Sequence, residues 1–228
     1  MDHHRIKELV QYMLIGDEST SWKLISEWIK GRDSVFLFED ILAAAMRYVG
    51  DLWEINEITV ADEHVASNVC NLLISRYTLD TIPANGSIEN EIHSTSTTPK
   101  AMLFCIEGEQ HSLGMKLVSS LFKEHGWDTR YLGANLPTND SIIYANRWRP
   151  DVIGISVSLI YNLPALTEFL KRIDQLEYEP KIIVGGRITS LYHLESDCPE
   201  NVLVLKDLYN LEALLLDNKL CNQPHAIT

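Results

Sequence analysis

The stretch at residues 105–114 combines residue types and a spacing that are suited to binding a metal. Glu109 stands two residues before His111, and Gly114 stands three residues after it. A carboxylate placed in this way can hold one nitrogen of an imidazole ring while the other nitrogen binds a metal ion. Gly114 would let a following helix begin close to a bulky ligand. The pattern Glu-x-His-x-x-Gly therefore predicts a metal-binding histidine with a carboxylate that orients it.

Taken alone, this pattern also has a plainer interpretation, because a Glu-x-His pair in a loop is more often a solvated pair than a metal site. No second histidine or cysteine stands at a zinc-like spacing from His111. The four cysteines lie far apart and form no Cys-x-x-Cys pair: Cys70, Cys105, Cys198 and Cys221. The rest of the chain must decide between the two interpretations.

The elements around residues 105–114 are expected to place the motif at a strand-to-helix turn. An apolar run at 101–106 predicts a strand, and the amphipathic segment 112–125 predicts a helix. Further strands are expected at 129–132, 152–158, 181–184 and 202–205, and further helices at 139–147, 163–176 and 208–219. Five strands that alternate with helices predict a parallel sheet covered on both faces. Ligands bind such sheets in the loops at the carboxyl ends of the strands.

The N-terminal part shows a different periodicity. Apolar residues at steps of three and four predict helices at 5–15, through Trp22 to Ile29, from Val35 to Val49, and from Thr59 to Leu79. Helices with such short connections indicate a four-helix bundle. The following segment, rich in Ser and Thr and with an Asn-Gly pair, is interpreted as a linker. We therefore expect a helical bundle at 1–81, a linker at 82–99 and a flavodoxin- or Rossmann-like domain at 100–228.

The composition limits the classes of partner that the protein could bind. The 228 residues carry a formal net charge of −13, which opposes a phosphate backbone and argues against direct binding of nucleic acid. No signal peptide is visible, and no apolar run approaches the roughly 18 residues of a membrane span. We expect a cytoplasmic protein that acts through a protein partner, and a homo-oligomer is compatible with the sequence.

The order of bundle, linker and sheet domain resembles the cobalamin-binding family. The residues that carry the resemblance are Glu109-x-His111-x-x-Gly114, then Ser156 and the pair Gly185-Gly186. The resemblance implies that His111 replaces the cofactor's own benzimidazole as the lower ligand of cobalt. It also implies that the displaced nucleotide tail threads beside the serine and the glycine pair. Arg187 stands where the family usually has a small residue, and its guanidinium would crowd the tail or contact its phosphate.

In the helical part, Trp53 is followed after nine residues by Glu63-His64. This spacing looks like the cap of light-sensing cobalamin-dependent repressors, and implies that Trp53 covers the upper face of adenosyl- or methylcobalamin while Glu63 and His64 line it. Taken singly, a tryptophan in a bundle is more often a core residue. Two features depart from these repressors: Glu54 replaces the histidine that binds cobalt after photolysis, and no winged-helix DNA-binding part is seen.

The resemblance favours a sensor, and we expect a cobalamin photoreceptor that is not an enzyme and signals through a partner protein. A second hypothesis keeps the sensor but replaces cobalamin by another tetrapyrrole, a bilin or haem, with Arg187 pairing with a propionate. A third hypothesis is a corrinoid carrier in methyl transfer, which needs the same His111. Trp53 with Glu63-His64 is the feature that favours a sensor over a carrier.

Overall fold

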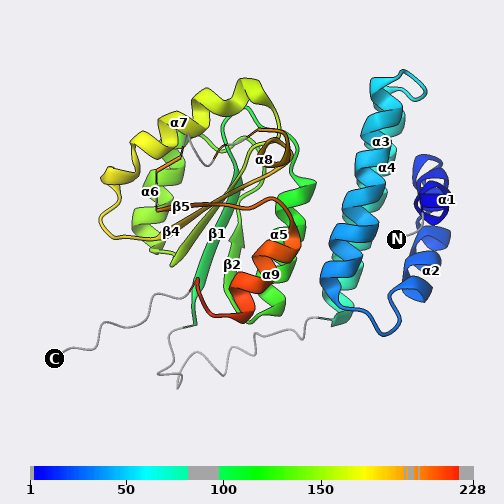
Figure 1. The fold of residues 1–228 in the computed structure, drawn as a ribbon, viewed down its shortest axis with the longest axis horizontal. Coiled ribbons are helices and arrows are strands. Elements are labelled where there is room, and N and C mark those ends of the chain that lie inside the picture. Colours follow the sequence, from blue (N-terminus) through cyan, green and yellow to red (C-terminus); the bar gives the residue numbers. More distant parts are fainter. Residues whose placement is uncertain (1–2, 82–97, 193, 195–197, 200, 221–228) are drawn as a thin grey trace. The chain divides into compact units, whose positions relative to one another are not determined.

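The computed structural model describes residues 3–81, 98–192, 194, 198–199 and 201–220 (Figure 1). The chain divides into two compact units, Met1–Asn85 and Gly86–Thr228, and each is described by itself. The expected linker at 82–99 lies almost wholly outside the described residues.

The N-terminal unit is a bundle of four helical rods. They are α1 (His3–Leu14), α2 (Glu18–Trp28), a π-helix η1 (Phe36–Ala43) that continues directly into α3 (Ala44–Glu54), and the long α4 (Val60–Thr81). Helix α4 packs against α1, α2 and α3. The bundle core consists of fully buried apolar side chains, among them Leu9, Met13, Ile25, Leu37, Ile41 and Leu73.

Local sequence explains where these helices begin and end. Asp17 caps α2, because its Oδ1 accepts the backbone N–H of Thr20 at 2.9 Å. The third helix differs from the prediction in two ways. Its first half is a π-helix, and it does not end at Val49 but runs on to Glu54. Trp53 therefore lies in the last turn of α3.

The C-terminal unit is built on a five-stranded sheet in which all neighbouring strands are parallel, as the sequence predicts (Figure 1). The strands are β1 (Lys100–Cys105), β2 (Asp128–Tyr131), β3 (Val152–Ser156), β4 (Lys181–Gly185) and β5 (Val202–Val204). Their order in the sheet is β2-β1-β3-β4-β5. This is the flavodoxin-like order, so the expected fold class is confirmed.

Helices cover both faces of the sheet. Helices α5 (Leu113–Glu124) and α9 (Leu208–Leu216) pack together, and α6 (Thr138–Trp148) packs with α7 (Leu163–Lys171). The expected helix at 163–176 is divided, because α7 ends at Lys171 and a 3-10 turn η4 (Ile173–Gln175) follows. Two short elements were not expected: the 3-10 turn η3 (Ile160–Asn162) before α7, and α8 (Ile188–Leu191) after β4.

The strand order creates a switch point between β1 and β3. The chain leaves β1 toward α5 and leaves β3 toward α7, so the two loops diverge to opposite faces of the sheet. Open parallel sheets bind ligands in the crevice that such diverging loops leave at the carboxyl ends of the strands. The fold thus places the Glu-x-His motif, which follows β1, at the expected location. Among the described residues, no helix is both long and apolar enough to cross a membrane.

Candidate cofactor-binding site

The carboxyl ends of three neighbouring strands stand at one level of the sheet. The last residue of β1, Cys105, is paired in register with Ser156, the last residue of β3. Ser156 is paired in turn with Gly185, the last residue of β4. The sequence predicted Ser156 and Gly185 as site residues, and the structure places them side by side below the loop that carries the histidine.

The loop at 106–112, which we call the histidine loop, turns sharply after β1. The backbone N–H of Glu109 returns to the carbonyl of Ile106 at 2.9 Å. Gly108 makes this turn with φ +86°, and a Cβ at Gly108 would stand only 2.9 Å from Oδ1 of Asn162. A glycine is therefore required here both by the backbone conformation and by the close neighbour.

Glu109 is the centre of the loop. Its side chain is completely buried, and each carboxylate oxygen accepts two hydrogen bonds. Oε1 receives the backbone N–H of His111 at 2.9 Å and lies 2.6 Å from Nδ1 of the same residue. Oε2 receives the backbone N–H of Ser158 at 2.7 Å and the amide Nδ2 of Asn162 at 3.1 Å. A buried carboxylate is thereby satisfied on both oxygens.

These contacts fix the charge of the carboxylate and the tautomer of the imidazole. Burial by itself would raise the pKa of Glu109, but the hydrogen bonds from His111, Ser158 and Asn162 outweigh it and lower that pKa to about 2. Because the ionised carboxylate can only accept, we assign the proton between the two groups to Nδ1 of His111. The neutral ring then presents a lone pair on Nε2, which is the nitrogen suited to bind a metal.

The imidazole is accessible from outside. The side chain of His111 is 62% exposed, although its Nδ1 partner is fully buried. Burial, and then the charge of Glu109, raise the pKa of the nearby Cys105 thiol to about 12, so this cysteine stays protonated in the cofactor-free protein. Within the described residues, no group of three or more His, Cys, Asp or Glu side chains is placed to hold a metal. A single exposed histidine nitrogen fits a metal whose other positions are supplied by a chelating cofactor.

The end of β4 provides backbone without side chains. Gly186 has φ +114°, and a Cβ on it would lie 2.2 Å from the carbonyl oxygen of Val157. Gly185 is different, because a Cβ there would meet only the carbonyl oxygen of Leu205 at 3.9 Å. Packing within the protein thus does not require glycine at position 185. A ligand that passes close to this backbone would require it. Ser156, which is paired with Gly185, is buried.

Two further predicted residues lie near the glycine pair and the histidine loop. Arg187 is exposed and directly precedes α8. Gly114 is in the first turn of α5, and apart from its chain neighbours and the nearby backbone of α5, no described atom lies within 4 Å of the position that its Cβ would take. As at Gly185, no described neighbour within the protein requires glycine at 114.

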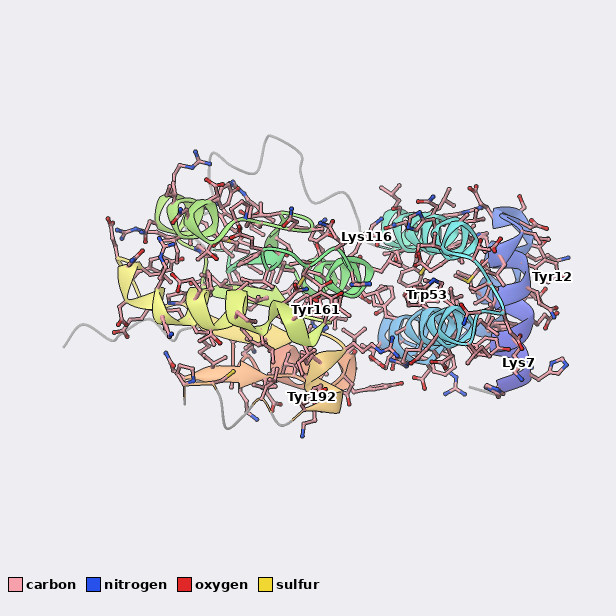
Figure 2. The ribbon with its side chains drawn as sticks, turned by 90° about the horizontal axis from the view of Figure 1, so that it is seen from above. Lys7, Tyr12, Trp53, Lys116, Tyr161 and Tyr192 are labelled. Carbon is pink, nitrogen blue, oxygen red and sulfur yellow. The ribbon has the colours of Figure 1, made fainter. Side chains whose placement is uncertain are left out.

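The helical unit carries the other predicted residues at one end of the bundle. Trp53 is 52% exposed, so it is not the core residue that a bundle tryptophan commonly is (Figure 2). Glu63 lies in the first turn of α4 and His64 directly follows it, and Oε1 of Glu63 accepts the hydroxyl of Ser67 at 2.6 Å. Nε2 of His64 lies 3.6 Å from Oε2 of Glu63. Trp53, Glu63 and His64 thus belong to one unit, and Glu109 with His111 to the other.

Sequence reasoning missed three residues of the histidine loop's surroundings. Ser158 and Asn162 bind Glu109, and Asn135 binds the backbone of the loop at Gly108 and Glu109. All three follow the ends of strands that neighbour β1 in the sheet. For Asn135 and Asn162, a polar residue soon after a parallel strand was the available signal, because such positions face the same edge as the motif. Ser158 binds through its backbone N–H, so its residue type gave no signal.

Comparison with known families identifies a B12 binding domain in each of the two units. Residues 99–205 match the model of a B12 binding domain, and residues 5–77 match the model of a second B12 binding domain. The first match contains all the predicted residues of the sheet unit. The second contains Trp53, Glu63 and His64.

The relatives found are corrinoid proteins. The chain is 24% identical to the dimethylamine corrinoid protein 3 of Methanosarcina acetivorans, over 66% of this chain and 67% of the relative. It is 24% identical to a corrinoid protein of Desulfitobacterium hafniense, over 81% of this chain and 84% of the relative. The solved structure of the Methanosarcina barkeri monomethylamine corrinoid protein has the same fold, with a TM-score of 0.69 at 16% identity, and covers 96% of this chain and 100% of its own.

These findings correct the expected function. The photoreceptor hypothesis is wrong, because these relatives are corrinoid proteins, and they include proteins named for dimethylamine and, at 25% identity, trimethylamine. The string from Trp53 to His64 lies within the matched helical B12 binding domain. The string therefore does not separate a sensor from a carrier.

The buried charge of Glu109 predicts a specific dependence of stability on pH. Because its pKa is lowered in the folded state, its ionised form stabilises the fold above its ordinary pKa near 4.5, and this contribution is lost as the pH falls toward 2. A shift of this size corresponds to about 3 kcal/mol. We expect Glu109→Gln to be less stable than the unmutated chain at pH 7 and to lose less stability between pH 5 and pH 2.

Urea unfolding at a series of pH values measures this difference. The matched control is Glu107→Gln on the same loop, because Glu107 is exposed and accepts the N–H of Thr138 at a long 3.3 Å. The control should keep the acid dependence of the unmutated chain. Equal acid dependence in Glu109→Gln and in the unmutated chain would contradict the assignment of a buried, ionised Glu109.

Proposed function

Because this chain carries a helical and a Rossmann-like B12 binding domain in tandem, we propose that it is a corrinoid carrier protein in methyl transfer. Its cofactor is cobalamin or a related corrinoid, as expected, whereas nothing supports the bilin or haem alternative. In this role the protein would hold the corrinoid while a methyl group is received from one partner and passed to another. The relatives named for dimethylamine and trimethylamine support this class of function.

The observation that carries the proposal is the pair of a buried Glu109 and an exposed His111. Glu109 holds Nδ1 at 2.6 Å, so Nε2 of the imidazole would be the nitrogen that binds cobalt. The corrinoid, when bound, supplies the cobalt–carbon bond that carries the methyl group. The chain itself orients the ring, fixes its tautomer and, through the buried carboxylate, stabilises the hydrogen bond that the ring donates.

The remaining predicted residues have roles that follow from their positions. Ser156, Gly185 and Gly186 would line the slot for the nucleotide tail, because two of the three lack side chains and the third is small and buried. Exposed Arg187 would lie near the phosphate of that tail. On the helical unit, the exposed indole of Trp53 would cover the upper face of the corrin, with Glu63 and His64 beside it.

A carrier of this kind is not itself a catalyst. The chemistry would be completed by methyltransferases that dock on the loaded protein. The solved methanol:cobalamin methyltransferase complex of Methanosarcina barkeri contains a chain of similar fold, with a TM-score of 0.52 at 15% identity. The match covers 98% of this chain and 82% of that one. The methyl donor would be a small methylated compound such as a methylamine or methanol.

Histidine ligation is tested by the spectrum of the loaded protein. We expect His111→Ala to lose the absorption features of a histidine-bound cobalamin, because no other described side chain in this loop offers a suitable nitrogen. The matched control is His125→Ala, which removes a histidine of the same unit at the C-terminal end of α5. The control should keep the spectrum of the unmutated protein, and an unchanged spectrum in His111→Ala would refute the ligand assignment.

The proposed slot for the nucleotide tail is tested by filling it with a larger side chain. Gly185→Leu should bind cobalamin roughly 5- to 150-fold more weakly, because overpacking in a filled slot costs roughly 1–3 kcal/mol. The same variant should bind cobinamide, which lacks the nucleotide tail, as well as the unmutated chain does. Equilibrium dialysis with both ligands measures the two affinities. Equal weakening for cobinamide would show that the substitution disturbs the fold rather than the slot.

The carrier function is tested by methylation of the reduced, cobalamin-loaded protein. Methylation is followed by absorption after adding monomethylamine, dimethylamine, trimethylamine or methanol, each with the methyltransferase that uses it. We expect one of these pairs to methylate the loaded protein faster than it methylates free cobalamin. Rates no higher than those of free cobalamin with every pair would count against the carrier role.

A further inference from the structure

The loop that follows β2 is hydrogen-bonded to the end of β1 and to the beginning of the histidine loop. The N–H of Cys105 binds the carbonyl of Gly133 at 2.9 Å, and the N–H of Leu136 binds the carbonyl of Cys105 at 3.1 Å. Ile106 and Leu136 form an isolated parallel bridge. The pairing of β1 with β2 thus continues past the ends of both strands and reaches the first residues of the histidine loop.

Asn135 extends this attachment to the turn itself. Its side-chain Oδ1 accepts the backbone N–H of Gly108 at 2.8 Å, and its own backbone N–H donates to the carbonyl of Glu109 at 2.9 Å. Asn135 therefore binds both the N–H at the start and the carbonyl at the end of the two-residue segment 108–109. Asn135 adopts φ +54°, a left-handed conformation that asparagine tolerates better than most residues.

The two contacts of Asn135 complement those made to the side chain of Glu109. Ser158 and Asn162 hold its carboxylate from the side of β3, and Asn135 holds its backbone from the side of β2. Because β1 lies between β2 and β3, the loop is held from two opposite sides. The turn contains Gly108, whose backbone has many accessible conformations, so the loop depends on these outside contacts to keep one of them.

We propose that Asn135 is a positioning residue for cobalt ligation. It holds the turn at 108–109 so that Glu109 reaches Ser158 and Asn162 while it still orients the ring of His111. Asn135 touches neither the ring nor any atom expected to bind cobalt, and its effect passes through the backbone of the loop. The link to cobalt rests on the proposed cofactor role, whereas the hold on the loop belongs to the protein alone.

Three variants separate the side-chain bond from other effects. Asn135→Gly tolerates the left-handed backbone but removes the acceptor for Gly108 N–H. Asn135→Asp keeps both the acceptor oxygen and a residue type that tolerates this backbone. Asn218→Gly is the matched control, because Asn218 has φ +51° in the same unit and lies just after α9, away from the sheet's ligand-binding edge.

The first measurement is amide hydrogen exchange in the cofactor-free protein. In Asn135→Gly we expect the N–H of Gly108 to exchange about tenfold faster, the loss of one hydrogen bond. The N–H of His111, which donates to Glu109, should also exchange faster, because the turn that carries Glu109 loosens. Asn135→Asp and Asn218→Gly should show neither change.

The second measurement is the absorption spectrum after loading with cobalamin. Asn135→Gly should show a smaller histidine-bound fraction than the unmutated protein, and Asn135→Asp should restore it. Faster exchange at Gly108 alone, with the His111 amide and the spectrum unchanged, would overturn the proposal and leave Asn135 a purely local role. If the unmutated protein binds no cobalamin, the proposed function fails, and the exchange rates at His111 still decide whether Asn135 positions the loop.

Discussion

The structure around the candidate site depends on one constraint: a fully buried carboxylate must have both oxygens hydrogen-bonded or lose its charge. Glu109 meets this constraint with donors from two separate segments, its own loop and the loop after β3. The charge then acts on the histidine, since an ionised Glu109 fixes the proton on Nδ1 and leaves Nε2 to bind metal. The same residue therefore sets the conformation of the loop and the chemistry of the ligand.

The fold makes this convergence possible. In a parallel sheet with the order β2-β1-β3-β4-β5, the loops after β1, β2 and β3 emerge at one edge, although they are far apart in the sequence. The histidine loop in the middle is reached by Asn135 from one side and by Asn162 from the other. The end of β4 supplies bare backbone at Gly185 and Gly186 beside them. The strand order thus brings together a histidine, the residues that hold it and the glycine backbone at the end of β4.

Much of this arrangement could be predicted from the sequence, because it depends on local patterns. Apolar periodicity predicts the bundle and the sheet, and the spacing of Glu109 and His111 predicts their hydrogen bond. The contacts of Ser158 and Asn135 could not be predicted, since they involve backbone atoms whose positions are set by loop conformation. The π-helix at the start of the third helix was also missed, because its residues have the same apolar character as an α-helix. The light-sensing hypothesis gave too much weight to the short string from Trp53 to His64, which belongs to a domain with broader use.

The central claim is that the imidazole of His111, oriented by Glu109, is the lower ligand of cobalt. Electron paramagnetic resonance of the protein loaded with cob(II)alamin tests it most directly, because the axial nitrogen splits the cobalt signal. With protein in which the histidines carry nitrogen-15 and cofactor of natural isotope content, the account predicts that each triplet splitting becomes a doublet. A triplet that persists in the labelled protein would show that the cofactor's own benzimidazole binds cobalt, and would contradict the account.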